Sequence, residues 1–248
     1  MDLGLHGRVA LVTGASRGIG FGIARTLAAE GASVAMSSPT RERIEAAAAE
    51  IGGRPYVHDN SDLDGAPRLV QRVGQELGPV DVLVLNTGGP PGGDPLEFTR
   101  DQWRDAQREL MLGPMALIRA ALPAMRERGF GRVLNISSSA AREPIPNLML
   151  SSAHRSGMLA TFKTLSRAVS ADGVTFNTIL PGRIATERLA HLYASLDEAE
   201  AVARDEVPVG RLGTVDEIAA AAAFLCSEQA SYVTGVALLV DGGLTRFT

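Results

Sequence analysis

Cysteine and histidine, two common ligands of transition metals, are scarce in this chain. Cys226 is the one cysteine among its 248 residues, so the sequence can form no internal disulfide bond and no centre of clustered thiolates. The four histidines, at positions 6, 58, 154 and 191, show no spacing typical of metal ligands. We therefore expect no metal site, and we expect Cys226, within the apolar run 219–226, to be a buried core residue.

Long apolar runs and concentrated positive charge are also missing. No stretch of about eighteen apolar residues occurs, so we expect no membrane span. The formal net charge is −4 and the basic side chains are scattered, which argues against a nucleic-acid partner. Lysine is almost absent, since Lys163 is the only lysine among 24 basic residues. The first residues lead into a strand-like segment without the features of a signal peptide, and we expect a cytoplasmic protein.

Apolar runs of strand length alternate with longer amphipathic segments. Most of the runs lack polar–apolar alternation, as expected for strands covered on both faces in a parallel sheet. Strands are expected at residues 8–13, 33–37, 55–58, 81–85, 131–137, 174–180 and 236–240, and helices at 19–30, 40–51, 63–77, 100–128, 148–171 and 215–226. The pattern predicts an α/β fold: a single Rossmann-type domain over residues 1–248 with a doubly wound, mainly parallel, seven-stranded sheet.

Two connections are longer than this alternation requires. Residues 88–98 follow the fourth expected strand, and residues 183–209 follow the sixth. Ligands of open α/β sheets bind beyond the carboxyl ends of the strands, so we expect both connections to line a substrate site rather than to be plain surface loops. The alanine-rich segment 192–203 favours a helical lid within the second connection.

A glycine-rich segment, residues 13–20 (TGASRGIG), joins the first expected strand to the first helix. Gly14 permits a sharp turn, Gly18 lets the backbone approach a pyrophosphate, and Gly20 lets the helix pack closely on the strand. The free N–H groups at the helix start would face the phosphates with a favourable dipole. A glycine trio between a strand and a helix, at the start of an α/β chain, predicts a dinucleotide site.

The Gly-x3-Gly-x-Gly spacing resembles that of the short-chain dehydrogenase/reductase family, and the resemblance covers nearly the whole chain. Segments 59–61 (DNS), 85–88 (LNTG), 181–182 (PG), 233–235 (VTG) and 241–243 (DGG) match further motifs of that family, most closely those of β-ketoacyl-carrier-protein reductase-like members. The resemblance implies an NAD(P)-dependent oxidoreductase with a small-molecule substrate, assembled as a homotetramer or dimer. It implies cofactor contacts from Gly14, Ser16, Arg17, Gly18, Ile19, Gly20, Ser38, Asp59, Asn60, Asn86, Gly88, Pro181, Gly182, Ile184 and Thr186.

The choice between NADP and NAD depends on the end of the second strand. A carboxylate there would bind the ribose 2′-OH of NAD and repel the 2′-phosphate of NADP, but residues 36–41 (MSSPTR) contain no acid. Arg17 and Arg41 could supply positive charge to the phosphate, with Ser38 among the hydrogen-bond donors. The alternative is that Arg41 belongs to a solvated helix face together with Glu45. The sequence favours NADP, with NAD as the alternative.

The family's acid and base positions hold other residues in this chain. Ser138 matches the family's serine, with Ser137 and Ser139 as neighbouring alternatives. Ser151 stands at the tyrosine, Arg155 at the lysine, and Leu110 at the asparagine. Tyrosine, with a free pKa of about 10, can protonate an alkoxide once a neighbouring cation lowers that pKa. A serine hydroxyl is a far weaker acid, and arginine stays protonated. We predict a divergent catalytic site of Ser138, Ser151 and Arg155, since an i,i+4 pair shares one helix face.

The sequence allows several roles for the residues of this site. Arg155 could stabilise an oxyanion with water as the proton source, anchor a substrate carboxylate, or pair structurally with an acid such as Glu143. Tyr193 could serve as a replacement acid. The leading hypothesis is an atypical oxidoreductase that reduces a small carbonyl or oxidises an alcohol. The alternative is an inactive NADP-binding sensor or scaffold, while halohydrin dehalogenase chemistry is disfavoured because that group keeps the tyrosine and rebuilds the glycine loop.

Overall fold

The computed structural model describes residues 1–190, 193 and 195–247 and shows one seven-stranded sheet in which every pairing is parallel. The strand order is β3-β2-β1-β4-β5-β6-β7. The strands are β1 (Val9–Thr13), β2 (Ser33–Ser38), β3 (Arg54–Val57), β4 (Val82–Asn86), β5 (Gly131–Ile136), β6 (Val174–Pro181) and β7 (Ala237–Val240). The order reverses between β1 and β4, so the crevice expected to bind ligands opens at their carboxyl ends.

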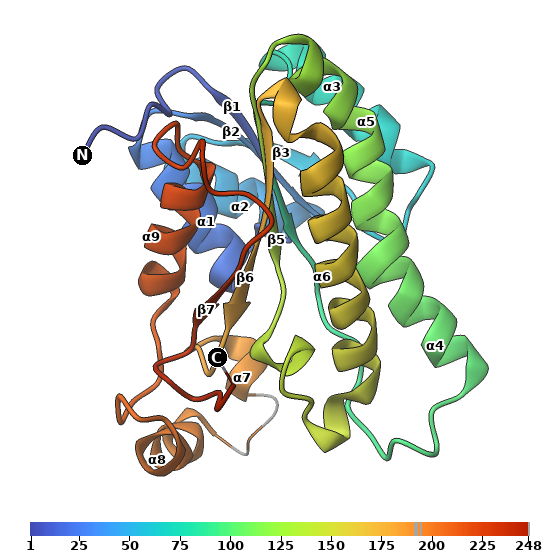
Figure 1. The fold of residues 1–248 in the computed structure, drawn as a ribbon, viewed down its shortest axis with the longest axis vertical. Coiled ribbons are helices and arrows are strands. Elements are labelled where there is room, and N and C mark those ends of the chain that lie inside the picture. Colours follow the sequence, from blue (N-terminus) through green and yellow to red (C-terminus); the bar gives the residue numbers. More distant parts are fainter. Residues whose placement is uncertain (191–192, 194, 248) are drawn as a thin grey trace.

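Helices cover both faces of this sheet, as Figure 1 shows. One face is packed by α1 (Gly18–Ala29), α2 (Arg41–Ile51) and α9 (Val215–Cys226), and the other by α3 (Gly65–Glu76), α5 (Gly113–Glu127) and α6 (Met149–Val169). Strands β1, β5 and β6 are buried along their whole length. Their burial on both sides follows from this double cover, and it includes polar side chains such as Arg132 and Asn177. The predicted doubly wound Rossmann fold is confirmed, and its sheet is wholly parallel.

The segment expected as one helix at 100–128 contains a change of helix type. Helix α4 (Arg100–Gln107) passes through a π-helical turn, η1 (Arg108–Leu112), into α5. Gly113, where α5 begins, passes so close to the Asn60 carbonyl that a Cβ would lie 1.8 Å from its oxygen. A periodicity near 3.6 residues cannot reveal one wider turn, so the sequence predicted the helix but not this feature.

The two long connections differ in structure. Residues 88–98 contain no helix or strand, whereas the connection after β6 contains α7 (Glu187–Ala190) and α8 (Leu196–Glu206). Part of the predicted lid helix at 192–203 therefore exists as α8, while residues 192 and 194 lie outside the described residues. Three short 3₁₀ turns lie in the connections around α6. Between β5 and α6 these are η2 (Ser139–Ala141) and η3 (Pro146–Leu148), and between α6 and β6 it is η4 (Ser170–Asp172).

Cys226 is fully buried at the end of α9, as expected. Within the described part of the chain, no helix combines the length and apolar character needed to cross a bilayer. The described residues also include no group of three or more His, Cys, Asp or Glu side chains placed to hold a metal ion.

Candidate active site

The glycine-rich loop forms a cradle between β1 and the start of α1. Gly14 and Gly18 have φ values of +56° and +57°, a region that side chains with a Cβ rarely adopt. A Cβ on Gly20 would lie 2.3 Å from the Gly14 carbonyl oxygen, so only glycine allows this close packing. The α1 N-cap, Arg17, gives no side-chain cap, and the first turn holds no acid. The exposed helix start is therefore a ready site for an anion.

Asn86, at the end of β4, ties this cradle to the neighbouring strand. Its Nδ2 donates to the Gly14 carbonyl at 3.0 Å, and its backbone N–H donates to Thr13 Oγ1 at 3.1 Å. The Asn60 side chain donates to the Asn86 carbonyl at 3.3 Å. Asp59 lies beside this group but accepts from the backbone N–H and the hydroxyl of Ser61. The structure thus brings the expected cofactor residues Gly14, Asn60 and Asn86 into one hydrogen-bonded group.

The segment after β6 lies opposite the glycine loop. A Cβ on Gly18 would lie 3.6 Å from Thr186 Cγ2, so the two segments face each other closely. The Thr186 hydroxyl donates to the Ile184 carbonyl at 3.3 Å, which fixes the start of this connection. The N–H of Gly182, directly after Pro181, donates to the Val240 carbonyl at 3.1 Å and ties the connection to β7. The expected residues after β6 therefore complete the second wall of the cradle.

The end of β2 carries hydroxyl groups and no carboxylate. The hydroxyl of Ser37 is buried without a hydrogen-bond partner, while that of Ser38 donates to the Thr40 carbonyl at 3.4 Å. Arg41 pairs with Glu45 at 3.1 Å. This contact agrees with the alternative that Arg41 lies on a solvated face of the helix. Arg17 pairs with Glu187 of α7. Both arginines are well exposed, and such surface pairs are worth only about 0–1 kcal/mol, so a phosphate could take over either guanidinium.

Arg155 of α6 is buried and held by hydrogen bonds at the carboxyl ends of β4 and β5. Its Nε donates to Ser151 Oγ at 3.1 Å, and Nη1 donates to the Ile136 carbonyl at 2.9 Å. Its Nη2 donates to the Gly88 carbonyl at 2.7 Å and to Thr87 Oγ1 at 3.4 Å. Four of the five N–H groups of a guanidinium are thus engaged, which leaves no pair free for a bidentate carboxylate clamp.

The charge of Arg155 survives its burial. Loss of solvation is the main cause that lowers its pKa to about 10, and the nearby Arg188 lowers it further, while Glu109 acts in the opposite direction. A pKa of about 10 still leaves the side chain charged at neutral pH. Arg155 is therefore a fixed positive charge and a hydrogen-bond donor, not a proton carrier.

The other candidate groups lie apart from the guanidinium of Arg155. Glu143 accepts from the backbone N–H of Arg246 at 2.8 Å, and none of the hydrogen bonds of Arg155 goes to it, which disfavours the alternative of a structural Glu143–Arg155 pair. Tyr193 receives a hydrogen bond from Arg183 and packs against the cluster that contains Ala199 and Leu212. These contacts hold the Tyr193 ring against α8 and Leu212 rather than against Ser151 and Arg155, which disfavours Tyr193 as a replacement acid.

Ser138 and Leu110 hold two further positions of the family's catalytic set. Ser138 follows β5, and its Oγ accepts from the Ala140 N–H at 3.2 Å. Leu110 is 3% exposed and belongs to the apolar core, so it offers no polar group. Ser151 and Arg155 share one face of α6, as the i,i+4 spacing predicts. The structure thus confirms the Ser151–Arg155 pairing.

Two charged residues at this site were not among the predicted site residues. Glu109 of η1 packs against Gly88, and Arg188 of α7 donates to the Gly89 carbonyl at 3.3 Å. Arg188 joins the connection after β6 to the one after β4, so the two predicted substrate walls meet. The one signal in the sequence was an acidic residue directly before Leu110, next to the position of the family's asparagine.

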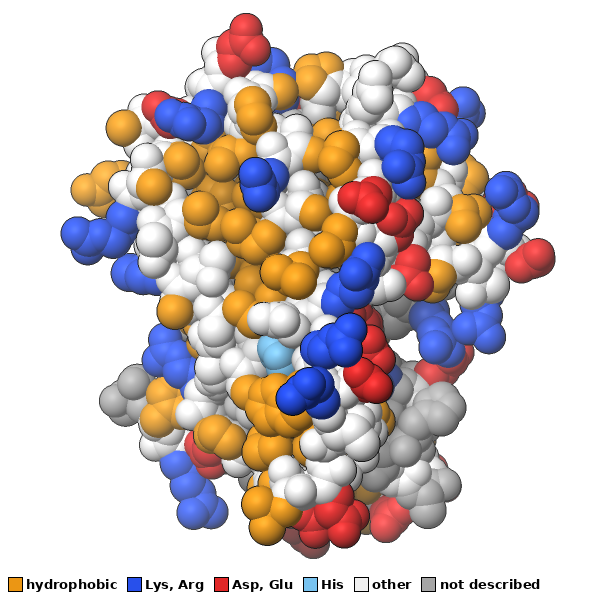
Figure 2. Space-filling model, turned by 90° about the vertical axis from the view of Figure 1, so that its right-hand side faces the viewer, with side chains coloured by type: hydrophobic (Ala, Val, Ile, Leu, Met, Phe, Trp, Pro, Cys, Tyr) orange, Lys and Arg blue, Asp and Glu red, His pale blue; other side chains and the backbone are white. Residues whose placement is uncertain are grey.

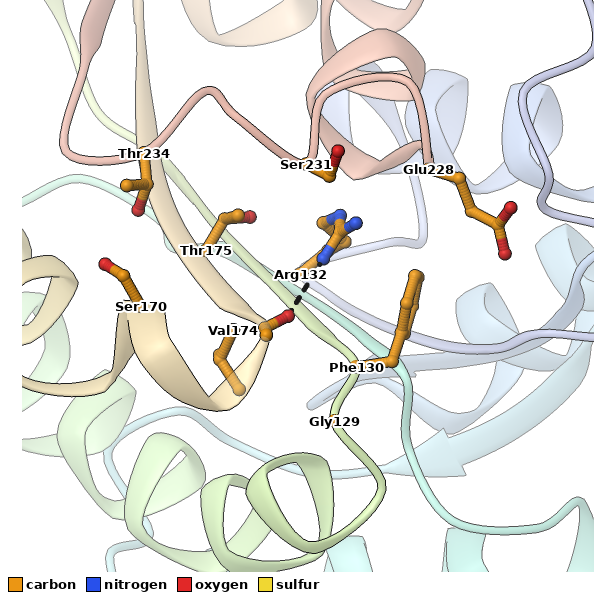
Figure 3. A pocket seen from close by; sticks show the side chains of 10 residues that line it. Gly129, Phe130, Arg132, Ser170, Val174, Thr175, Glu228, Ser231 and Thr234 are labelled. Atoms are coloured by element: carbon orange, nitrogen blue, oxygen red, sulfur yellow. Dashed lines mark hydrogen bonds between the residues drawn. The ribbon is translucent and has the colours of Figure 1, made fainter.

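A separate hollow lies at the other end of the sheet. Figure 3 shows it at the amino ends of β5 and β6, where Arg132 donates to backbone carbonyls and stacks 4.3 Å from the Phe130 ring. Its lining comes from Gly129, Phe130, Arg132, Ser170, Gly173, Val174, Thr175, Glu228, Ser231 and Thr234. It shares no residue with the glycine cradle or with the surroundings of Arg155, and it is not part of the candidate active site.

Comparison with known proteins agrees with this geometry over the whole chain. A family model described as enoyl-(acyl carrier protein) reductase matches residues 14–245. The 3-oxoacyl-[acyl-carrier-protein] reductase FabG of Haemophilus influenzae is 34% identical over 242 residues, covering 97% of this chain and 99% of that protein. The acetoacetyl-CoA reductase of Shinella zoogloeoides is 35% identical over 237 residues, covering 95% and 98%.

Solved structures show the same likeness. The L-sorbose reductase of Gluconobacter frateurii, complexed with NADPH and L-sorbose, has a TM-score of 0.93 and 30% identity, with 100% of both chains covered. With the parallel seven-stranded sheet and the glycine cradle at its switch point, these likenesses show that the chain belongs to the short-chain dehydrogenase/reductase family.

Proposed function

We propose that this protein is an NADP(H)-dependent oxidoreductase that reduces a small carbonyl compound, or oxidises the corresponding alcohol, by an atypical mechanism. The observation that carries the proposal is the glycine cradle, which Thr186 closes on its far side. The neighbouring end of β2 carries the hydroxyl of Ser37 and no carboxylate. The relatives named above are reductases, and the L-sorbose reductase structure contains NADPH. When bound, the cofactor supplies a hydride to the carbonyl carbon.

The residues around the cradle fit this cofactor. The pyrophosphate would lie against the α1 start at Ser16, Arg17, Gly18 and Ile19, where the positive φ and the missing Cβ of Gly18 leave room for it. The adenosine end would lie at Ser38 and near Asn60, and the nicotinamide end between Gly88 and the 181–186 segment. The missing carboxylate favours NADP over NAD.

Ser138 and Ser151 are suited to hold the carbonyl oxygen of a substrate. Ser151 accepts a hydrogen bond from the charged Arg155, and Ser138 accepts one from the Ala140 N–H. Each hydroxyl therefore keeps its own hydrogen for donation. The positive charge of Arg155 polarises the Ser151 hydroxyl and stabilises negative charge on a nearby oxygen. We assign Ser138 and Ser151 as donors to the developing oxyanion and Arg155 as the charge behind them.

We also propose a homo-oligomer, a tetramer or dimer, built on the face of α5 and α6. Figure 2 shows a broad stretch of hydrophobic side chains on this face. Leu112 is 44% exposed there, and Met115, Ala116, Leu122 and Leu165 are only partly buried. Light scattering on the purified protein, with a Leu112→Glu variant for comparison, tests this assembly. A cytoplasmic location completes the proposal, and cell fractionation tests it.

Fluorescence titration with NADPH and NADH tests the proposed function, with Trp103 and the nicotinamide as reporters. We expect saturable binding, tighter for NADPH, followed by oxidation of NADPH in the presence of some members of a ketone panel. Binding without turnover of any ketone or alcohol would favour an inactive NADP-binding sensor or scaffold. Failure to bind either nucleotide would overturn the proposal.

A further inference from the structure

Glu109 places a carboxylate beside Arg155 at the carboxyl end of β4. It lies in the π-helical turn η1, directly before Leu110. A Cβ added to Gly88 would lie 2.4 Å from Glu109 Oε1, so the carboxylate packs directly on this glycine. The Gly88 carbonyl accepts the 2.7 Å hydrogen bond from Arg155 Nη2. The carboxyl group of Glu109 and the guanidinium of Arg155 therefore meet at one glycine.

The local geometry separates the roles of these two charged groups. Arg155 is 8% exposed and engaged by four acceptors, whereas Glu109 is half-buried and can exchange protons with solvent. Among the described residues, no guanidinium lies within ion-pair distance of the Glu109 carboxylate. Single π-helical turns within α-helices are frequent at functional sites. Glu109 is thus the accessible titratable group next to a fixed buried cation.

Three charged side chains and one backbone N–H act on the Glu109 carboxyl. Burial is the largest influence and raises its pKa above the usual 4.5, and Asp59 raises it further. Arg155 of α6, Arg188 of α7 and the N–H of Gly88 act in the opposite direction and do not cancel the effect of burial. A larger fraction of Glu109 is therefore protonated near neutral pH than for an exposed glutamate.

We propose that Glu109 is the acid–base residue of this active site, an inference that rests on the proposed reductase function. When hydride from NADPH adds to the carbonyl carbon, the π electrons of the C=O bond move onto the oxygen. The O–H bond of the Glu109 carboxylic acid breaks, and its proton reaches that oxygen through an intervening hydroxyl or water. The carboxylate then regains a proton from solvent, the substrate has become an alcohol, and the cofactor has become NADP⁺. Alcohol oxidation reverses each transfer.

This assignment supplies the group that the serine and arginine cannot. The hydroxyls of Ser138 and Ser151 are too weakly acidic to be net proton sources, and Arg155 keeps its proton. A carboxylic acid with a raised pKa can both release and regain a proton near neutral pH.

The experiment combines a titration of the free protein with steady-state kinetics. In protein labelled with ¹³C at glutamate side-chain carboxyls, the signal lost in Glu109→Gln identifies Glu109, and we expect it to titrate above pH 4.5. With NADPH and a ketone that the wild type reduces, we expect kcat/KM to fall as pH rises through that same pKa. In Glu109→Gln we expect kcat to fall about 100-fold, the usual scale of general acid catalysis, with unchanged NADPH affinity and without this pH dependence.

Two control variants keep the test specific. Glu127→Gln makes the same chemical change at an exposed position at the end of α5 and should leave kcat and its pH profile unchanged. Glu109→Asp keeps an acid and should recover part of the rate with a shifted profile. A Glu109→Gln variant that keeps both kcat and the pH dependence would overturn the assignment, and so would a Glu109 signal that titrates at or below 4.5. A wild type that binds NADPH but turns over no substrate would overturn the proposed function instead, and the titration would still decide whether Glu109 has the required acidity.

Discussion

Arg155 Nε donates a hydrogen bond to Ser151 Oγ, 3.1 Å away and one helical turn earlier on α6. The same guanidinium reaches the ends of two strands, through the carbonyls of Ile136 and Gly88. One side chain therefore joins α6, β5 and the segment after β4 at the place where a substrate carbonyl would lie. Because these bonds fix the guanidinium, they also fix the orientation of the Ser151 hydroxyl.

Replacement of Arg155 by lysine should lower stability despite the retained charge. A lysine ammonium has three donors on a narrower head group, so it cannot serve Ser151, Ile136 and Gly88 together. A buried acceptor left without a partner costs about 1–3 kcal/mol, and we expect the free energy of unfolding to drop by about that amount. Urea denaturation of Arg155→Lys and wild type measures the difference. An exposed control, Arg41→Lys, should change it by less than about 1 kcal/mol, and equal losses in both variants would contradict the structural role of Arg155.

Gly18 and Gly52 form a matched pair for testing the cradle. Both have positive φ, +57° and +68°, but Gly52 ends α2 in open space far along the chain from the cradle, whereas Gly18 faces Thr186. Alanine should destabilise the fold at either position by about 1–2 kcal/mol through backbone strain. Only Gly18→Ala should weaken NADPH binding, by about tenfold or more, because its methyl group enters the proposed pyrophosphate site. Titration calorimetry measures this, and equal NADPH affinity in the two variants would speak against the cradle.

Much of the architecture could be predicted from the sequence because mainly apolar segments of strand length alternate with longer amphipathic segments. Strands β1 and β4 were expected within one residue of their observed bounds, and Gly14 and Gly20 show the turn and the close packing expected of them. The parallel order follows from alternation and right-handed crossovers. These features depend on local composition and on general rules of chain connection, which a single sequence displays.

The surroundings of Arg155 depend on contacts that a sequence does not display. Glu109, Gly88 and Arg188 lie far apart along the chain and meet only because the strand ends converge. The π-helical turn around Glu109 leaves no trace in the hydrophobic period. The i,i+4 spacing did predict that Ser151 and Arg155 share a face, since that relationship is local. Long-range contacts between charged residues arise only from the tertiary fold, so the sequence alone does not predict them.

Glu217 should make stability depend on pH in the acidic range. Its carboxylate accepts hydrogen bonds from Arg211 and from the Thr214 backbone N–H, and these lower its pKa from the usual 4.5 to about 2. A depressed carboxyl pKa stabilises the folded state above pH 4.5, and this stabilisation is lost as pH falls towards 2. The melting temperature of Glu217→Gln should therefore lie below that of wild type at neutral pH and approach it in acid. Glu50→Gln, at an exposed position in α2, serves as the control, and a gap that widens in acid would contradict the prediction.

Cys226 should report on global unfolding. Its thiol is fully buried at the end of α9, and burial raises its pKa to about 12, although Arg132 acts in the opposite direction. Only the thiolate attacks a disulfide reagent, so the folded protein offers neither access nor the reactive form. We expect labelling by Ellman's reagent to be negligible in the native state and to rise in urea in step with the loss of circular dichroism. Rapid labelling of the native protein would contradict this prediction, because it would show that α9 opens without global unfolding. The packing of α9 against α1, to which the buried Ile218 and Ala222 belong, would then be weak.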